Sequence, residues 1–216
     1  MSEFAVIGLG QFGMSVARHL AHQGEAVMAI DLDQELVDDV AADVDVAIRA
    51  DATDERTLKE LELETMTCVV VAIGAASIEA SVLTTALLRQ LGVPRVVARA
   101  MSDLHARVLR AIGADEVVNP EEEMGRRLAV HLSQPSILEQ LELGDSNLAE
   151  VEAPEAFVEC TLAELDMRNK YQVSVMAIQR GEKVIANPMG SETIQSGDIL
   201  VIVGSVESIR RIAALA

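Results

Sequence analysis

The chain has 216 residues, half of them apolar, and a formal net charge of −18. This length fits one mid-sized domain plus a small one. The charge disfavours a nucleic-acid binder, because such proteins carry a basic face for the phosphates. No apolar stretch reaches the roughly 20 residues of a membrane-spanning helix, and no basic region precedes the first apolar run, so we expect neither a transmembrane segment nor a signal peptide. The isolated Cys68 and Cys160 fit a reducing cytoplasm.

Short apolar runs alternate with segments of helical apolar spacing over residues 1–119. These runs predict strands over residues 4–8, 26–31, 44–51, 68–74, 95–101 and 115–119. The segments between them predict helices over residues 10–24, 34–43, 54–63, 77–92 and 105–113. Strands that alternate with helices form βαβ units. The region therefore predicts an α/β fold with a Rossmann-like, doubly wound parallel sheet that is covered on both faces.

The pattern changes after residue 120. Residues 121–141 predict a helix that is broken near Pro135. Short strands closed by turns then follow, with a last helix over residues 207–216; the strands are expected over residues 148–154, 172–181, 183–188 and 198–205. We expect three regions, namely a Rossmann-like domain over residues 1–120, a crossover helix and connector over residues 121–144, and a small α+β domain over residues 145–216.

A glycine-rich loop joins the first predicted strand to the first predicted helix. Its sequence, Gly8-Leu9-Gly10-Gln11-Phe12-Gly13, has the spacing GxGxxG. In this context the first glycine permits a tight turn, the second lets a diphosphate approach the backbone, and the third lets helix and strand pack closely. Free N–H groups and the helix dipole attract phosphates there, so the loop predicts a nucleotide site.

Asp31 ends the second predicted strand, roughly 20 residues after the loop, where a carboxylate accepts hydrogen bonds from ribose hydroxyls. A carboxylate there disfavours a 2′-phosphate, so we do not expect NADP. Asp33 is a second candidate for the same role. The alternative is that the glycines and these acids only form a turn.

Two further loops lie at the carboxyl ends of predicted strands, where α/β sheets bind ligands. The segment Asp51-Ala52-Thr53-Asp54 follows the third strand and is expected to flank an adenosine. Its alternative role is helix capping by Asp51 or Thr53, and capping is the role that we expect for Asp54. Ile73 and Gly74 end the fourth strand, where a glycine permits close approach of a ligand.

The sequence lacks a recognisable catalytic arrangement. The histidines lie in predicted helices, at positions that we interpret as solvated or interfacial, and none pairs with a nucleophile or a carboxylate; they are His19, His22, His105 and His131. We therefore expect a regulatory protein and not an enzyme. A small NAD-linked oxidoreductase remains as an alternative.

Several segments together resemble one family along nearly the whole chain. They are FAVIGLGQFG, AIDLD, ADATDE, VVVAIG, EASVLTT, IGADEVVNPEEEMGRRLA, LDMRNKY and GDILVIVGS. They resemble the RCK (or KTN) regulatory subunits of Ktr-type potassium transport systems, which are related to TrkA. The resemblance implies homodimers that assemble into an octameric ring on the inner, cytoplasmic face of the membrane. It also implies a partner, a potassium-translocating membrane subunit of the KtrB or TrkH type, and control of ion flux by exchange of ATP and ADP.

The resemblance assigns roles to individual positions. The nucleotide positions that it carries over are Gly8, Gly10, Phe12, Gly13, Asp31, Asp51, Thr53, Ile73 and Gly74. Arg99 matches a basic position near the phosphates that is usually lysine. Glu121 matches a carboxylate that helps to bind a divalent cation, such as Mg²⁺, at the triphosphate. The alternative for Glu121 is an acid that faces the helix dipole, which is the role we expect for Glu122 and Glu123.

Two departures from the family pattern leave the ligand open. Gln11 stands where arginine is common, and a neutral side chain removes a charge-assisted contact with the terminal phosphate. The preference for ATP over ADP is therefore open, and an NAD(H)-sensing module of a Trk system or a cation antiporter remains an alternative. The loop after Gly74 is also one residue longer than the usual form.

Some relatives in this family bind cyclic di-AMP between paired C-terminal domains. The matching positions here are the segment Leu165-Asp166-Met167-Arg168-Asn169 with Ser174 and Pro188. Ser174 stands where binders often have asparagine. The alternative, which we prefer from the sequence, is that these residues form a dimer interface without this ligand.

Overall fold

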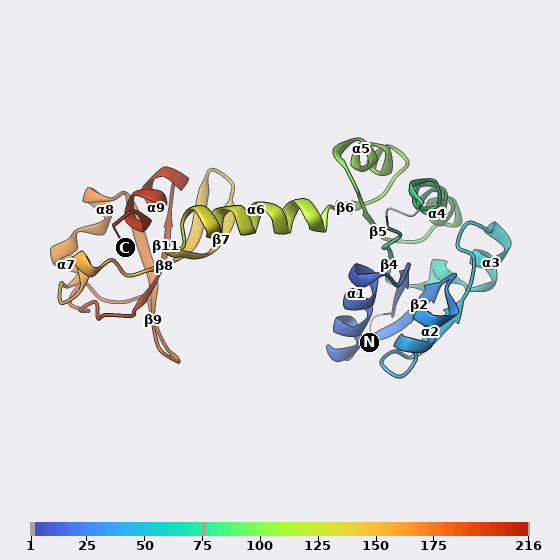
Figure 1. The fold of residues 1–216 in the computed structure, drawn as a ribbon, viewed down its shortest axis with the longest axis horizontal. Coiled ribbons are helices and arrows are strands. Elements are labelled where there is room, and N and C mark those ends of the chain that lie inside the picture. Colours follow the sequence, from blue (N-terminus) through green and yellow to red (C-terminus); the bar gives the residue numbers. More distant parts are fainter. Residues whose placement is uncertain (1–2, 75–76, 216) are drawn as a thin grey trace. The chain divides into compact units, whose positions relative to one another are not determined.

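The computed structural model describes residues 3–74 and 77–215 and divides into two compact units, Met1–Glu122 and Glu123–Ala216 (Figure 1). Ala75 and Ala76, which lie in the loop expected to be longer than usual, fall outside the described residues. Among the helices of those two stretches, none has the length and apolar character that crossing a membrane requires.

The first unit contains a six-stranded sheet in the order β3-β2-β1-β4-β5-β6. All neighbouring strands are parallel, as predicted. The strands are β1 (Glu3–Ile7), β2 (Ala26–Asp31), β3 (Val46–Arg49), β4 (Cys68–Val71), β5 (Val96–Arg99) and β6 (Glu116–Val118). The helices are α1 (Gln11–His22), α2 (Gln34–Val40), α3 (Glu55–Glu60), α4 (Ile78–Leu91) and α5 (Asp103–Ala111). The predicted doubly wound α/β fold is confirmed, and its strand order reverses direction between β1 and β4.

Helices cover both faces of this sheet (Figure 1). α1 and α2 bury Ala17 and Val37 on one face, and α4 and α5 bury Leu88 and Leu109 on the other. Strands that are buried on both sides need apolar residues at every position, and all four residues of β4 are buried. The faces are thus occupied by packing, and the carboxyl ends of β1 and β4 remain the place where a ligand can approach the sheet.

Local sequence signals explain where the helices begin and end. Ser77 precedes α4, and its hydroxyl accepts a hydrogen bond from the N–H of Ala80 at 3.0 Å. The same helix ends at Gly92, whose φ of +84° is a left-handed conformation that glycine adopts without strain. α1 ends before Gly24, which has the same φ, as the sequence predicts.

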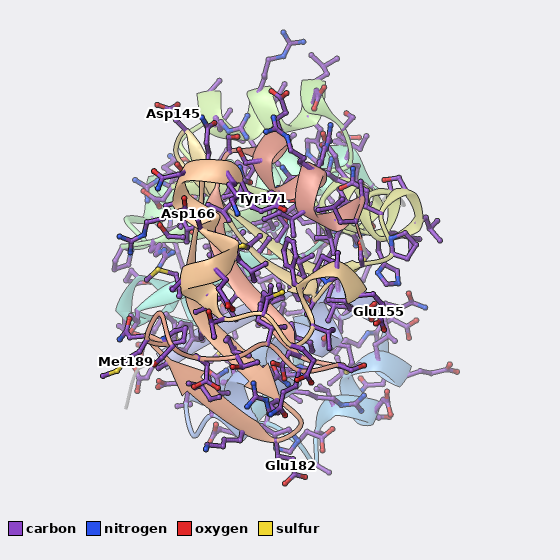
Figure 2. All side chains as sticks on the ribbon, turned by 90° about the vertical axis from the view of Figure 1, so that its left-hand side faces the viewer. Asp145, Glu155, Asp166, Tyr171, Glu182 and Met189 are labelled. Carbon is purple, nitrogen blue, oxygen red and sulfur yellow. The ribbon has the colours of Figure 1, made fainter. Side chains whose placement is uncertain are left out.

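The second unit contains a five-stranded antiparallel sheet in the order β10-β9-β11-β8-β7. Its strands are β7 (Ile137–Leu143), β8 (Ser146–Glu152), β9 (Val173–Arg180), β10 (Lys183–Ala186) and β11 (Ile199–Gly204). Its helices are the short α7 (Leu162–Leu165) and α8 (Met167–Lys170), and α9 (Val206–Ala213). Figure 2 labels Asp145 at the turn between β7 and β8 and Glu182 at the turn between β9 and β10.

The helix predicted over residues 121–141 is correct only in its first part. α6 (Pro120–Ser133) ends before Pro135, and the helical prediction for residues 136–141 is wrong because Ser136 lies in a turn and residues 137–141 lie in β7. Leu143 pairs with Ser146 across a turn in which Gly144 has a φ of +60°, so the segment folds back as a hairpin. The functional division into residues 1–120, 121–144 and 145–216 stays a prediction.

Arg180, the last residue of β9, forms an ion pair with Asp198, which directly precedes β11. Arg180 donates two hydrogen bonds to Asp198, from Nε to Oδ1 at 2.9 Å and from an amino group to Oδ2 at 2.8 Å. Asp198 is only 1% exposed and also accepts the N–H of Gln195 at 2.9 Å. The hydrogen bond from Arg180 is the main cause that lowers the pKa of Asp198 below its ordinary value. The pair is fully satisfied within the fold, which identifies it as a structural contact.

Candidate functional site

The glycine loop owes its shape to close backbone contacts. Gly8 has a φ of +94°, and a Cβ there would lie 2.9 Å from the backbone nitrogen of Ile73, at the end of β4. A Cβ at Gly13 would lie 1.8 Å from the carbonyl oxygen of Gly8. Real Cβ atoms do not approach backbone so closely, so both positions need glycine for different reasons. The two glycines let α1 begin directly against the ends of β1 and β4.

Gly10 differs from the other two glycines because the space next to it is open. A Cβ at this position would meet no other atom within 4 Å. Gly10 precedes α1, where no side chain forms a cap and the first turn contains no acidic residue. The first N–H groups of a helix lack partners within the helix and carry its positive dipole end. The loop therefore combines room with donors, which suits a phosphate group.

Asp31 is held in place by two backbone hydrogen bonds. Its Oδ2 accepts the N–H of Leu9 at 2.5 Å, and its Oδ1 accepts the N–H of Asp33 at 2.8 Å. A carboxylate oxygen has two lone-pair sites, so each oxygen can still accept a hydroxyl. The same side chain thus fixes the glycine loop and presents acceptors to a ribose.

The other acids of this edge make local hydrogen bonds. Asp33 caps α2 by accepting the N–H of Glu35 at 3.0 Å. Asp51 accepts the N–H and the hydroxyl of Thr53, at 2.9 and 2.6 Å, so neither residue is the helix cap that the alternative interpretation proposed. Asp54 caps α3, as predicted, and the hydrogen bonds from Thr57 lower its pKa. The ligand roles of Asp33, Asp51 and Thr53 stay predictions.

Two loops frame the remaining sides. Ala52 is buried, and its carbonyl accepts a hydrogen bond from the hydroxyl of Thr84 on α4 at 3.0 Å. This bond holds the loop after β3 against the helix. Ile73 and Gly74 follow β4, and a Cβ at Gly74 would lie 3.5 Å from an amino nitrogen of Arg99. The end of β4 therefore runs directly beside the arginine at the end of β5.

Arg99 lies between an aromatic ring and a carboxylate. Its guanidinium carbon is 5.7 Å from the centre of the Phe12 ring, and one amino group forms an ion pair with Glu121. The Arg99 side chain is 12% exposed, and its buried Nε has no hydrogen-bond partner among the described residues. Buried donors without partners cost free energy. The positive charge of Arg99, next to the glycine loop, is suited to an anionic ligand.

Glu121 lies in the first turn of α6, directly after β6. Its side chain is 55% exposed and pairs with Arg99, a contact that the sequence did not indicate. Glu122 takes the local role instead: it exchanges hydrogen bonds with Asn119, whose side chain accepts the N–H of Glu122 at 3.3 Å. Within the described stretches, no three His, Cys, Asp or Glu side chains group closely enough to hold a metal. A cation here would need ligand oxygens besides Glu121.

One of the histidines is not where the sequence placed it. His105 is only 3% exposed, so its prediction as a solvated or interfacial residue is wrong. Its Nδ1 accepts the N–H of Met101 at 3.3 Å, and burial lowers its pKa. His19, His22 and His131 are exposed, as expected. His105 points inward because the amphipathic helix α5 turns that face toward the sheet.

The second unit contains a pocket of about 330 Å³ at the positions that the family resemblance links to cyclic di-AMP. Its lining includes Asp166, Met167, Arg168, Asn169 and Pro188 from the predicted set. Leu165 is buried in the core of the unit, and Ser174 lies in β9 outside the lining. The lining also includes Val175, Gly190 and two residues of α7, which the sequence did not single out. Figure 2 shows Asp166 and Met189 on this unit.

Family models match both parts of the chain. Residues 4–120 match the TrkA-N domain, and residues 148–216 match the TrkA-C domain. The Ktr system potassium uptake protein C of Bacillus subtilis is 43% identical over 210 residues, covering 97% of this chain and 95% of that protein. The Ktr system potassium uptake protein A of Vibrio alginolyticus is 38% identical over 204 residues, covering 94% of this chain and 92% of that protein.

Solved structures of the GsuK channel share the fold at low identity. The GsuK channel superposes with a TM-score of 0.72 and 16% identity over 99% of this chain, which spans 39% of that channel's chain. The GsuK channel bound to NAD gives a TM-score of 0.55 at 21% identity, and the match covers 100% of this chain and 38% of the channel's chain. GsuK bound to ADP gives a TM-score of 0.52 at 24% identity, and the match covers 62% of this chain and 34% of the GsuK chain. With its TrkA-N and TrkA-C domains, the chain belongs to the RCK regulatory subunits of Ktr-type potassium transport systems.

Proposed function

We propose that this chain is a regulatory subunit that binds adenine nucleotides in its first unit and thereby controls a membrane potassium uptake channel or transporter. The observation that carries the proposal is the meeting of the glycine loop, Asp31 and Arg99 at the carboxyl ends of β1, β2, β4 and β5. Gly10 leaves room for a diphosphate, Asp31 offers acceptors to the ribose, and Arg99 offers charge to the phosphates.

ATP and ADP are the ligands that we propose, and NAD(H) is the alternative. The loop and Asp31 serve any of them, because all contain a diphosphate and an adenosine ribose. GsuK, a channel with the same fold, has been solved bound to NAD and bound to ADP. Gln11 supplies no charge, so in this proposal Arg99 carries most of the interaction with a terminal phosphate. The two nucleotides regulate flux only to the extent that they bind the conformations of the assembly with different affinity.

The pairing of Arg99 with Glu121 suggests how a divalent cation takes part. A phosphate that contacts Arg99 replaces Glu121 as its anionic partner, and the carboxylate then faces the phosphate. A carboxylate and a phosphate that face each other closely repel unless a cation lies between them. Mg²⁺ suits this position, because it is commonly held by one or two carboxylates together with phosphate oxygens. Glu121 would supply the protein ligand, and the nucleotide would supply the rest.

We further propose that the chain acts as an oligomer, with a homodimer as the minimum and an octameric ring as the family form. Several large apolar side chains of the helices are exposed, as expected for surfaces that pack against other subunits. They are Ile78 and Leu83 on α4, Leu104 and Val108 on α5, and Met124, Leu128 and Leu132 on α6. The proposed partner is a potassium-translocating subunit of the KtrB or TrkH type, on whose cytoplasmic face the ring would sit.

Cyclic di-AMP in the second unit is a further candidate. The pocket places Arg168 and Asn169 beside Pro188, so it offers a cation and an amide to a phosphodiester and a base. The alternative, a dimer interface without this ligand, uses the same residues. Calorimetric titration with cyclic di-AMP separates them: Arg168→Gln abolishes the heat of binding in the first case, and no heat arises from the unaltered protein in the second.

The decisive experiment identifies the ligand and then tests control. The nucleotide that remains bound through purification is identified by chromatography, and affinities for ATP, ADP and NADH are measured by calorimetry. Potassium flux is then recorded in vesicles that contain the membrane subunit with and without this chain. We expect flux to depend on this chain and to differ between ATP and ADP. Hydride transfer from NADH to a carbonyl substrate would instead revive the oxidoreductase alternative.

A further inference from the structure

The carboxyl end of β3 carries an arginine, Arg49, to which no role has been assigned. Arg49 is the last residue of β3, and in the sheet register it is the direct neighbour of Asp31 on β2. Neighbouring residues in register project from the same face of a sheet. Arg49 therefore starts from the same face and the same edge as the proposed ribose carboxylate.

The side chain of Arg49 is fixed across the end of β2. Its Nε donates a hydrogen bond to the carbonyl oxygen of Leu32 at 3.0 Å. Among the described residues Arg49 forms no ion pair, and its side chain is exposed. One hydrogen bond thus orients the guanidinium of an otherwise exposed side chain. A planar cation held in this way has lost part of its conformational freedom before any ligand binds.

A purine base packs against flat or apolar side chains, and the first unit has only two aromatic residues, Phe4 and Phe12. The chain contains three phenylalanines, one tyrosine and no tryptophan. Phe157 and Tyr171 belong to the core of the second unit, Phe4 packs under α1 and α2, and Phe12 contacts Arg99 at the phosphate end. The base must therefore lie against aliphatic side chains or a guanidinium. Leu32 is 61% exposed and lies next to Arg49, so the two can face a base together.

We propose that Arg49 forms one wall of the adenine site, with its guanidinium plane against the base. The inference rests on the proposed function, because it assumes that an adenosine ribose binds at Asp31. Guanidinium groups stack on aromatic faces and attract them through the cation–π interaction. The hydrogen bond to the Leu32 carbonyl holds the guanidinium beside the end of β2, where Asp31 lies. Residues at the ends of two adjacent strands would thus position the ribose and the base.

The test uses calorimetric titration of the full chain with ATP, ADP and NADH. Arg49→Lys keeps the charge without the plane, and Arg49→Gln keeps a polar chain without the charge. Both should weaken all three ligands by about 3- to 20-fold. Arg49→Tyr restores a flat face and should recover affinity to within about threefold of the unaltered protein. Arg56→Gln, on the exposed side of α3, is the matched control and should change nothing.

Several outcomes would overturn the proposal. Unchanged affinities in Arg49→Lys and Arg49→Gln would remove Arg49 from the site. A Tyr variant as weak as the Gln variant would show that Arg49 acts through its charge or through the Leu32 carbonyl. Tighter binding of NADPH than of NADH, with that advantage lost in Arg49→Gln, would assign the guanidinium to a 2′-phosphate. An unaltered protein that binds no nucleotide refutes the proposed function itself, which the other outcomes leave standing.

Discussion

Two arginines, one in each unit, show how the same side chain serves different purposes. Arg180 in the second unit is satisfied by the fold: it makes two hydrogen bonds to the buried Asp198 and a third to the carbonyl of Thr193. Arg99 in the first unit has one carboxylate partner, which is exposed, and a buried Nε with no partner among the described residues. The difference separates a contact that holds a fold together from a contact that can change partners.

The largest expected effect is a loss of stability in the first unit, caused by a substitution in the glycine loop. In Gly13→Ala the new methyl group would lie 1.8 Å from the carbonyl oxygen of Gly8, so α1 must move away from the sheet. We expect the first unit to lose about 3 kcal/mol or more of its free energy of unfolding, measured by urea denaturation. Gly125→Ala is the control, because a Cβ there meets no atom within 4 Å. A loss below about 1 kcal/mol in Gly13→Ala contradicts the packing described here.

The next effect tests the structural arginine. Asp198→Asn leaves the charge of Arg180 without its buried partner, and we expect the second unit to lose about 3 kcal/mol, at the low end for such pairs because Arg180 is 28% exposed. Nucleotide affinity should not change. Glu192→Gln, which removes a 3.3 Å contact to Arg180 at a more exposed carboxylate, should cost less than about 1 kcal/mol. Equal losses of unfolding free energy in Asp198→Asn and Glu192→Gln would contradict the structural role given to the buried pair.

Acid provides a second measurement on the same pair. The pKa of Asp198 is lowered in the folded chain, so the unfolded chain binds protons more tightly at this position. Its contribution to stability is therefore complete above the unfolded pKa of about 4 and is lost as the pH falls toward the folded pKa. In Asp198→Asn this part of the acid dependence should disappear. Denaturation at a series of pH values between neutral and strongly acidic reads it directly.

A smaller effect is expected at the ribose position. Asp31→Ala removes the acceptors for the ribose hydroxyls and should weaken ATP, ADP and NADH by about 1–3 kcal/mol. Gly10→Val should leave the fold intact, because the space beside Gly10 is open, and should block the diphosphate. Asp54→Ala serves as the control, since Asp54 caps α3 and should affect stability more than binding. Calorimetry that finds the affinities of Asp31→Ala and Gly10→Val unchanged would falsify the site.

The smallest effect concerns the exchangeable partner of Arg99. In Glu121→Gln, the affinity for ATP in EDTA should hold or rise, because Arg99 no longer has a competing carboxylate. The gain in ATP affinity on adding Mg²⁺ should fall by about 1 kcal/mol, while ADP changes less. Glu123→Gln, in the same turn of α6, is the control. An equal Mg²⁺ effect in the unaltered protein and in Glu121→Gln would leave Glu121 as a partner of Arg99 and of the helix dipole only.

The sequence predicts the first unit better than the second for a physical reason. Strands that are buried on both faces are continuous apolar runs, and the glycine loop has a fixed spacing, so the parallel sheet and its ligand edge follow from local patterns. The strand β7 is exposed along most of its length, and its residues Ile137 and Leu141 have the spacing of a helix. Its pairing with β8 decides its conformation, and pairing is not a local property.

The sequence does not predict contacts between residues that are distant along the chain, for the same reason. Arg99 and Glu121 are brought together only by the parallel pairing of β5 with β6 and the start of α6. The burial of His105 depends on how α5 packs on the sheet. The local hydrogen bond between Asp51 and Thr53 competes with helix capping, and the sequence alone cannot rank the two. Interactions close in sequence were thus predictable in kind, and interactions across the sheet were not.

The hydrogen bond from Leu9 to Asp31 has a kinetic consequence. Because the chain's own contacts shape the glycine loop, a nucleotide need not order it, and association is not slowed by a folding step. Ligands that enter a preformed site exchange as fast as they dissociate. Occupancy then follows the momentary ratio of competing nucleotides, each weighted by its dissociation constant. Under the proposed function, with ATP and ADP as the competing ligands, the subunit would respond to their ratio rather than to the amount of either one.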